Sequence, residues 1–227
     1  MTVAERLEVV RRQVARAAAR GGRAAADVTI VAVTKGFSAG VIADAVRAGA
    51  VDLGENRAQE LREKAIAVTG DVRWHFIGHL QTNKARHVVG LATVIHSVDR
   101  LALADEVARR ARSAGFVQEV LVEVNIAGEA SKHGVEPARA AALAREVAAL
   151  DGLAVRGLMA MAPLADDPER SRPYFKDLRG LGEEVAAEVP GATQLSMGMS
   201  RDFEVAVEEG ATLVRVGEAI FGPRRPR

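Results

Sequence analysis

A lysine stands at the end of an apolar segment, where a reactive amine would be sheltered from water. Lys35 follows the segment Val28–Thr34, whose β-branched and apolar residues are typical of a strand buried on both faces. Removing an ammonium group from water lowers its pKa, and a neutral lysine amine can condense with an aldehyde. The chain has 26 Arg but only 5 Lys, and Arg cannot do this chemistry. The alternative is a plain surface lysine at a strand end.

Two segments near the C-terminus could bind an anion. Ser196–Ser200 leads into a predicted helix, so the backbone around Met199 and the hydroxyl of Ser200 would lie at the positive end of that helix. Gly217 and Glu218 follow the next predicted strand and offer a second group of N–H donors. Together these segments predict a phosphate site. The alternative is an ordinary turn in which Ser200 caps the helix.

Other polar residues follow further predicted strands. Asn56 follows the second strand, His79 the third, and Arg215 ends the eighth. An arginine at the rim could bind an anion or a ring nitrogen, or it could form a structural ion pair. The carboxylates that could pair with it are Glu55, Glu123 and Asp202.

Metal and hydrolase chemistry find little support. His75 and His79 are four residues apart in a strand and its following loop, where that spacing does not bring two side chains together. No carboxylate has the spacing of a metal ligand around them, so we expect no metal site. The Gly-x-Ser-x-Gly motif of a serine hydrolase is also absent.

Short β-branched segments alternate with Ala-rich amphipathic stretches, which is typical of parallel βα units. The predicted strands are Val28–Thr34, Val51–Leu53, Val72–Ile77, Thr93–Val98, Glu119–Val124, Leu153–Leu158, Thr193–Ser196 and Thr212–Val216. The predicted helices are Thr2–Ala19, Ser38–Ala48, Glu55–Val68, Asn83–Val89, Asp99–Ala114, Glu136–Leu150, Glu169–Val189 and Ser200–Glu209. A closed (β/α)8 barrel and an open doubly wound sheet are both compatible with this order. Eight strands, and no Gly-x-Gly-x-x-Gly after the first, favour the barrel.

Composition limits the remaining function classes. The 227 residues are 48% apolar with a net charge of +1, so the chain can build a core and lacks the basic excess of nucleic-acid or membrane-surface binders. The absence of cysteine excludes disulfides and thiolate chemistry. No apolar stretch approaches the roughly 20 residues that span a bilayer. We expect a cytoplasmic protein with one domain over 1–227, in which a helix within residues 1–24 packs on the barrel.

Several segments together resemble one known family. They are Val31–Lys35, Gly54–Arg57, His75–Lys84, Val124–Ile126, Gly157–Met159, Ser196–Ser200 with Asp202, and Val214–Gly217 followed by Ile220–Gly222. On these segments the chain resembles the pyridoxal-phosphate homeostasis proteins, which are small proteins that bind pyridoxal 5′-phosphate. The resemblance implies one (β/α)8 barrel similar to the N-terminal domain of alanine racemase. It also implies that the cofactor forms a Schiff base with Lys35.

The resemblance assigns roles to the other candidate residues. It implies that the cofactor phosphate lies at Met199, Ser200, Gly217 and Glu218, that Arg215 lies against the pyridine nitrogen, and that Asn56 lies near the ring. His79 is expected beside the cofactor as well. Many members of the family have a small hydroxyl residue where this chain has Glu218. A carboxylate repels phosphate, so this position would help through its backbone N–H alone.

These roles favour binding over catalysis. A carboxylate partner keeps the pyridine nitrogen protonated and strengthens the ring as an electron sink, whereas Arg215 would leave it weak. The first hypothesis is therefore a non-catalytic protein that stores pyridoxal 5′-phosphate and delivers it to apo-enzymes, as a monomer or weak dimer. The alternative is an amino-acid racemase, which needs a second base. The tyrosine that supplies this base in alanine racemase belongs to a C-terminal domain that we do not expect here, so His79 would have to replace it. A third possibility is a cofactor-free Schiff-base aldolase. The sequence shows no obvious acid–base pair beside Lys35, which argues against it.

Overall fold

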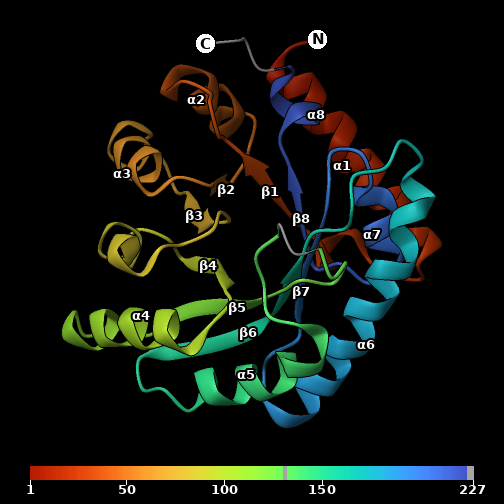
Figure 1. Ribbon diagram of the computed structural model, residues 1–227. Coiled ribbons are helices and arrows are strands. Elements are labelled where there is room, and N and C mark those ends of the chain that lie inside the picture. Colours follow the sequence, from red (N-terminus) through yellow and green to blue (C-terminus); the bar gives the residue numbers. More distant parts are fainter. Residues whose placement is uncertain (130–131, 224–227) are drawn as a thin grey trace.

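The computed structural model describes residues 1–129 and 132–223. In this part of the chain, parallel strands close into a barrel in chain order, and the last strand pairs with the first (Figure 1). The strands are β1 Thr29–Val33, β2 Asp52–Glu55, β3 Arg73–Phe76, β4 Val94–Val98, β5 Gln118–Val124, β6 Leu153–Ala160, β7 Gln194–Met199 and β8 Leu213–Val216. The predicted (β/α)8 barrel is confirmed, and each predicted strand is present.

Helices surround the barrel (Figure 1). The α-helices are α1 Val3–Arg20, α2 Ala39–Arg47, α3 Ala58–Ala67, α4 Leu101–Ser113, α5 Ala140–Ala148, α6 Arg172–Glu188, α7 Phe203–Glu208 and α8 Glu218–Phe221. The 3-10 turns are η1 Ala25–Asp27, η2 Thr82–His87, η3 Pro137–Arg139 and η4 Pro168–Ser171. No helix among the described residues combines the length and the apolar character that crossing a bilayer would require.

The N-terminal helix begins as the sequence predicts. The hydroxyl of Thr2 accepts a hydrogen bond from the Glu5 backbone N–H at 3.2 Å, and the Glu5 carboxylate accepts one from the Thr2 backbone N–H at 2.8 Å. This reciprocal capping satisfies two donors that have no intrahelical acceptor. The apolar face of α1 packs against α2, α7 and α8. Arg20 at its end pairs with Glu208 at 2.5 Å.

Two other helices differ from the sequence-based expectation. The helix predicted over Asp99–Ala114 begins later, because α4 has Arg100 at its N-cap and the Asp99 carboxylate accepts a hydrogen bond from the Arg100 side chain at 2.5 Å. A charged neighbour thus competes successfully with the helix for this carboxylate. The stretch predicted as a helix over Asn83–Val89 is the 3-10 turn η2.

The side chains inside the barrel include both apolar and polar residues. Successive residues of a strand point to opposite faces, so every second residue faces inward. Val94, Leu121 and Met159 form a small apolar cluster separate from the main core. The strands also carry buried polar residues, among them His75, His96, Ser196 and Arg215. The main core lies between the outer faces of the strands and the surrounding helices, including Ile42 and Leu178.

Candidate functional site

A cavity of about 520 Å³ lies at the C-terminal ends of the strands. This is the end at which barrel enzymes bind their ligands, because each strand delivers its last side chain and its following loop there. The cavity is lined by all the residues that the sequence singled out as a cofactor site: Lys35, Asn56, His79, Met199, Ser200, Arg215, Gly217 and Glu218. The structure therefore gathers in one place residues that are spread over 184 positions of the chain.

Strand alternation places Lys35 at the cavity. Val33 lines the cavity, and Lys35 is two residues later, so it falls on the same side of the chain. Lys35 is half-buried. Thr34, between them, points the other way, and its hydroxyl donates to the Glu55 carboxylate at 3.0 Å behind the strand.

A buried ion pair behind the strand holds the backbone on both sides of Lys35. The Lys64 ammonium group, from α3, contacts the Glu55 carboxylate at 2.5 Å and donates to the Thr34 carbonyl at 2.8 Å. It also donates to Glu60 at 2.9 Å, and the Glu60 carboxylate accepts the Gly36 backbone N–H at 3.2 Å. Since Thr34 and Gly36 flank Lys35, helix α3 fixes the position from which the lysine reaches the cavity.

The same network explains why Glu55 is not a partner of Arg215. Inward and outward positions alternate along β2, and the Glu55 side chain is fully buried against α3 and Lys64. The ion pairs expected between Arg215 and Glu55, Glu123 or Asp202 are absent from residues 1–129 and 132–223. Arg215 is bound by neutral acceptors instead.

Arg215 is nearly fully buried, at 4% exposure, and is held by oxygen atoms of two neighbouring strands. Its guanidinium group donates to the Ser196 carbonyl at 2.7 Å, to the Ser196 hydroxyl at 2.6 Å and to the Ala160 carbonyl at 2.9 Å. Burial lowers the pKa of Arg215 to about 10, although the nearby carboxylates of Glu123 and Asp202 act in the opposite direction. The group therefore stays protonated near neutral pH. Three of its five N–H donors are used in these bonds.

A chain of buried hydrogen bonds continues from Arg215 through the barrel. The Ser196 hydroxyl lies 2.9 Å from His96 Nδ1, His96 Nε2 lies 2.9 Å from His75 Nδ1, and His75 Nε2 lies 2.9 Å from the Asp52 carboxylate. Burial, with the charges of His75 and Arg215, holds the pKa of His96 well below its ordinary value, so His96 is neutral.

The neighbours of each group fix the direction of these hydrogen bonds. Arg215 can only donate and the Asp52 carboxylate can only accept. In the state in which both imidazoles are neutral, Ser196 donates to His96, His96 donates to His75, and His75 donates to Asp52. A protonated His75 would instead donate from both of its ring nitrogens. Burial raises the pKa of Asp52, but the hydrogen bonds from His75 and Arg73 outweigh it, and the net shift is downward. We name these residues, Arg215, Ser196, His96, His75 and Asp52, the polar chain.

Two polar atoms in the cavity wall lack a partner. The Asn56 side-chain oxygen and the Glu123 Oε2 atom are both buried without a hydrogen bond within the described residues. Burial and the charge of Asp99 raise the pKa of Glu123 to about 7, against a smaller opposite effect of Arg215. Unsatisfied buried polar atoms are rare in folded proteins and indicate a missing partner. These atoms therefore fit a polar ligand in the cavity.

The loops after β7 and β8 lie together, as expected for a phosphate site. The Ser200 hydroxyl accepts the backbone N–H of Gly217 at 3.2 Å and that of Ala219 at 3.4 Å. Ser200 does not cap the helix that follows it, because α7 begins only at Phe203 and the Asp202 carboxylate accepts the Met199 N–H at 2.7 Å. Its hydroxyl lies instead at the start of α8, whose first N–H groups it accepts. The Ser200 proton remains available to a ligand.

The last glycine of β7 gives this loop its close approach to α7. Gly198 has a φ of 88°, in the left-handed region that glycine adopts most readily. A Cβ atom there would lie 2.5 Å from the Cβ of Ala206. Glu218 is the first residue of α8, so its N–H has no intrahelical acceptor, while its side chain is exposed at the cavity.

His79 lies on the opposite wall of the cavity beside a second histidine. The rings of His79 and His133 are stacked, with centroids 3.6 Å apart and planes inclined by 13°. His79 Nδ1 lies 3.6 Å from the Asp99 carboxylate. Burial and His133 lower the pKa of His79, against the effect of Asp99, so His79 is neutral near pH 7.

These groups could supply ligands to a metal, since one atom from each of His79, Asp99 and His133 falls within 4.8 Å of the others. Stacked imidazoles hold their nitrogen lone pairs in parallel planes, which does not direct them to one point. His75 is not part of this cluster, in line with the argument from spacing. The absence of a metal site stays a prediction.

The polar chain escaped the sequence analysis. Its members come from five strands, and a sequence does not show which residues of neighbouring strands face each other. One signal was available. Asp52, His75, His96 and Ser196 are polar residues at positions of predicted strands where an apolar side chain would ordinarily be buried. The sequence points to Glu123 only as an ion-pair partner.

Comparison with known proteins defines the class to which this fold and site belong. Residues 7–225 match the family model described as "Alanine racemase, N-terminal domain". An alanine racemase from Clostridium difficile superimposes with a TM-score of 0.71 at 15% identity, over 86% of this chain and 52% of that one. At that identity the likeness concerns the fold alone. The chain is thus a barrel of the alanine racemase N-terminal type.

More similar proteins narrow this class. The pyridoxal phosphate homeostasis protein of Aquifex aeolicus is 44% identical over 227 residues, covering 99% of this chain and 100% of that protein. That of Deinococcus radiodurans is 46% identical over 206 residues, with coverage of 90% and 94%. PipY of Synechococcus elongatus, solved with PLP bound, has a TM-score of 0.84 at 34% identity and covers 97% and 100%. The chain belongs to the pyridoxal phosphate homeostasis protein family.

Proposed function

We propose that this protein binds pyridoxal 5′-phosphate as a Schiff base with Lys35 and holds it for delivery to other proteins. The observation that carries the proposal is the convergence of Lys35, Arg215 and the two C-terminal loops on one cavity. The relative PipY binds the same cofactor. The cofactor, when bound, supplies an aldehyde that reacts with amines.

The residues present fit the parts of the cofactor. Ser200 can donate its hydroxyl proton to the phosphate, and Glu218 its backbone N–H, while Asn56 offers an unsatisfied buried oxygen near the ring. Arg215 has N–H donors left for the pyridine nitrogen after binding Ser196 and Ala160. Each of these residues lines the cavity that Lys35 enters.

The charge of Arg215 supports a binding role. Its pKa of about 10 keeps it protonated at pH 7, so it would donate a hydrogen bond to the pyridine nitrogen of a bound cofactor. A nitrogen that accepts from Arg215 is not itself protonated, which leaves the ring a weak electron sink. Such a site holds a reactive aldehyde without strongly activating an attached amino acid. Relatives named pyridoxal phosphate homeostasis proteins support a role in the balance of the cofactor.

A racemase is the second candidate, and one observation favours it. His79 lines the same cavity as Lys35 and has a lowered pKa, so it could act as a second base. Holo-protein incubated with L-alanine in deuterated water decides between the two functions. We expect no exchange of the α-hydrogen and no loss of optical rotation. Rapid exchange that disappears in His79→Gln would favour the racemase.

The cofactor attachment is tested by colour and mass. Purified protein given pyridoxal 5′-phosphate should be yellow, lose the band on borohydride treatment and gain one cofactor mass on the peptide that contains Lys35. Lys35→Ala should lose the adduct. Lys176→Ala, which removes an exposed lysine of α6, is the matched control. A colourless protein, or an adduct elsewhere, overturns the proposal. Delivery is measured as reactivation of a pyridoxal-phosphate-dependent apo-enzyme.

A further inference from the structure

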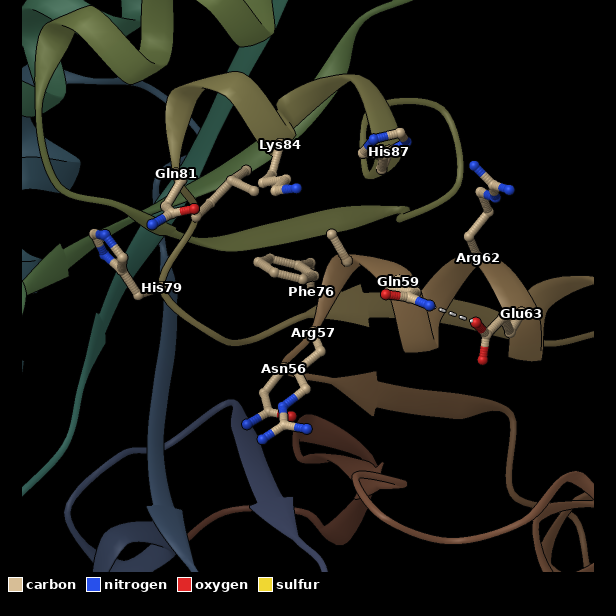
Figure 2. Close-up of a pocket in the computed structure, with 12 residues that line it drawn as sticks. Asn56, Arg57, Gln59, Arg62, Glu63, Phe76, His79, Gln81, Lys84 and His87 are labelled. Carbon is tan, nitrogen blue, oxygen red and sulfur yellow. Dashed lines mark hydrogen bonds between the residues drawn. The ribbon is translucent and has the colours of Figure 1, made fainter.

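A second cavity, of about 540 Å³, opens beside the first (Figure 2). It lies between α3 and the 3-10 turn η2, and its floor is formed by Phe76 and Leu80. Asn56 and His79 line both cavities, so the two share a wall. A volume of this size is typical of small-molecule sites, which occupy about 300–1,000 Å³.

Cations from two separate elements face this cavity. Figure 2 shows Arg62 extending from α3 toward η2, and Lys84 extending from η2 into the gap above Phe76. Both side chains are exposed, and no carboxylate of the described residues lies within ion-pair distance of either. The Glu63 carboxylate at the same cavity accepts a hydrogen bond from Gln59 at 3.0 Å. Unpaired positive charges thus converge on a concave surface.

His87 lies within reach of these positive charges. It lines the same cavity, and its pKa is lowered by desolvation and then by the charges of Arg86, Arg62 and Lys84. Concave sites lined by charges of one sign concentrate ions of the opposite sign. An anion placed between Arg62 and Lys84 would relieve the repulsion and would favour the charged form of His87.

We propose that this cavity, lined by Arg62, Lys84 and His87 above a floor of Phe76 and Leu80, binds a small organic anion. The ligand carries a carboxylate or a phosphate monoester on an apolar body. The cations bind the charged group, and Phe76 and Leu80 contact the apolar body. The proposal goes beyond cofactor attachment at Lys35 and does not depend on it. A ligand here would lie next to the cofactor cavity, separated from it by Asn56 and His79.

The probes are phenyl phosphate, benzoate and the neutral benzamide, with binding followed by calorimetry and by NMR of the His87 ring. The titrations use protein whose cofactor has been reduced onto Lys35. The first cavity is then filled, so phenyl phosphate cannot bind there. We expect phenyl phosphate or benzoate to bind and to raise the pKa of His87, and benzamide to do neither. The anion that binds more tightly shows whether the cavity prefers a phosphate or a carboxylate. If the cofactor does not attach, the same titration on the untreated protein still tests this cavity.

Variants assign the binding to the named cations. Lys84→Gln and Arg62→Gln should each weaken anion binding about tenfold, the effect of one charge-assisted hydrogen bond. Both residues are exposed, so the fold and the formation of the Lys35 adduct should be unaffected. Lys176→Gln on α6 removes the same charge far from the cavity and should bind as the unmodified protein does. Equal binding of benzamide, an unmoved His87 pKa, or unchanged affinity in both cation variants would overturn the proposal.

Discussion

The buried carboxyl group of Glu123 makes a sharp prediction about stability and pH. Its side chain is 3% exposed, and its pKa of about 7 compares with an ordinary value of 4.5. At about 1.36 kcal/mol per pKa unit, this difference corresponds to about 3 kcal/mol. Below pH 4.5 the group is protonated in both the folded and the unfolded state, so Glu123 no longer lowers the free energy of unfolding. As pH rises through 4.5 the unfolded state releases its proton first, so stability falls until the folded protein also ionises near pH 7.

Glu123→Gln keeps this position neutral at every pH and therefore removes the penalty. In cofactor-free protein, we expect the variant and the unmodified protein to have equal free energies of unfolding near pH 4. At pH 8 the variant should be about 3 kcal/mol more stable. Urea unfolding at several pH values measures the difference. Glu184→Gln, which removes an exposed carboxylate of α6, is the control for loss of one charge. A difference that does not change with pH, or a less stable Glu123→Gln at pH 8, would refute the reasoning.

Three further predictions concern groups around the cofactor cavity. Ser196→Ala removes a hydrogen-bond partner from buried Arg215, and should lower the free energy of unfolding by about 1–3 kcal/mol in urea titration; an unchanged midpoint would contradict the assigned bond. Lys64→Met leaves Glu55 buried without a counter-charge and should cost about 3–5 kcal/mol, whereas adding Glu55→Gln should recover most of it; no recovery would mean that packing, not charge, dominates. Gly198→Ala puts a Cβ into the left-handed region and against α7, so thermal unfolding should occur several degrees lower, at a cost above about 1 kcal/mol. An equally stable variant would show that the loop can move.

The fold and the location of the site could be predicted because they depend on local patterns. Lys35 ends an apolar strand, and in a parallel barrel every strand end reaches the same rim. This rule requires no knowledge of which strands are neighbours. It placed Asn56, Arg215 and Gly217 at the cavity as well as Lys35.

The remaining features depend on register and could not be predicted. The segment predicted to end at Leu53 continues to Glu55, and the added residues determine that Glu55 points to α3 and not into the barrel. The strand predicted to end at Ser196 continues to Met199 through an irregular register with β8. This extension moves Ser200 from the start of α7 to the start of α8, whose first N–H groups its hydroxyl accepts. Shifts of two or three residues thus changed the role of a side chain, although they left the fold intact.

The direction of the hydrogen bonds in the polar chain links the two ends of the barrel. In the state in which both imidazoles are neutral, every donor from Arg215 to Asp52 points the same way, so the bond dipoles add, as peptide dipoles add in a helix. Asp52 is bound at 2.7 Å by Arg73, whose side chain is 55% exposed at the N-terminal end of the strands. A substitution or a bound ion at Arg73 would change the electric field at Arg215, the other end of the polar chain. In the proposed binding mode, with Arg215 at the pyridine nitrogen, the electronic character of the cofactor would therefore be open to long-range tuning from a face of the protein that never touches it.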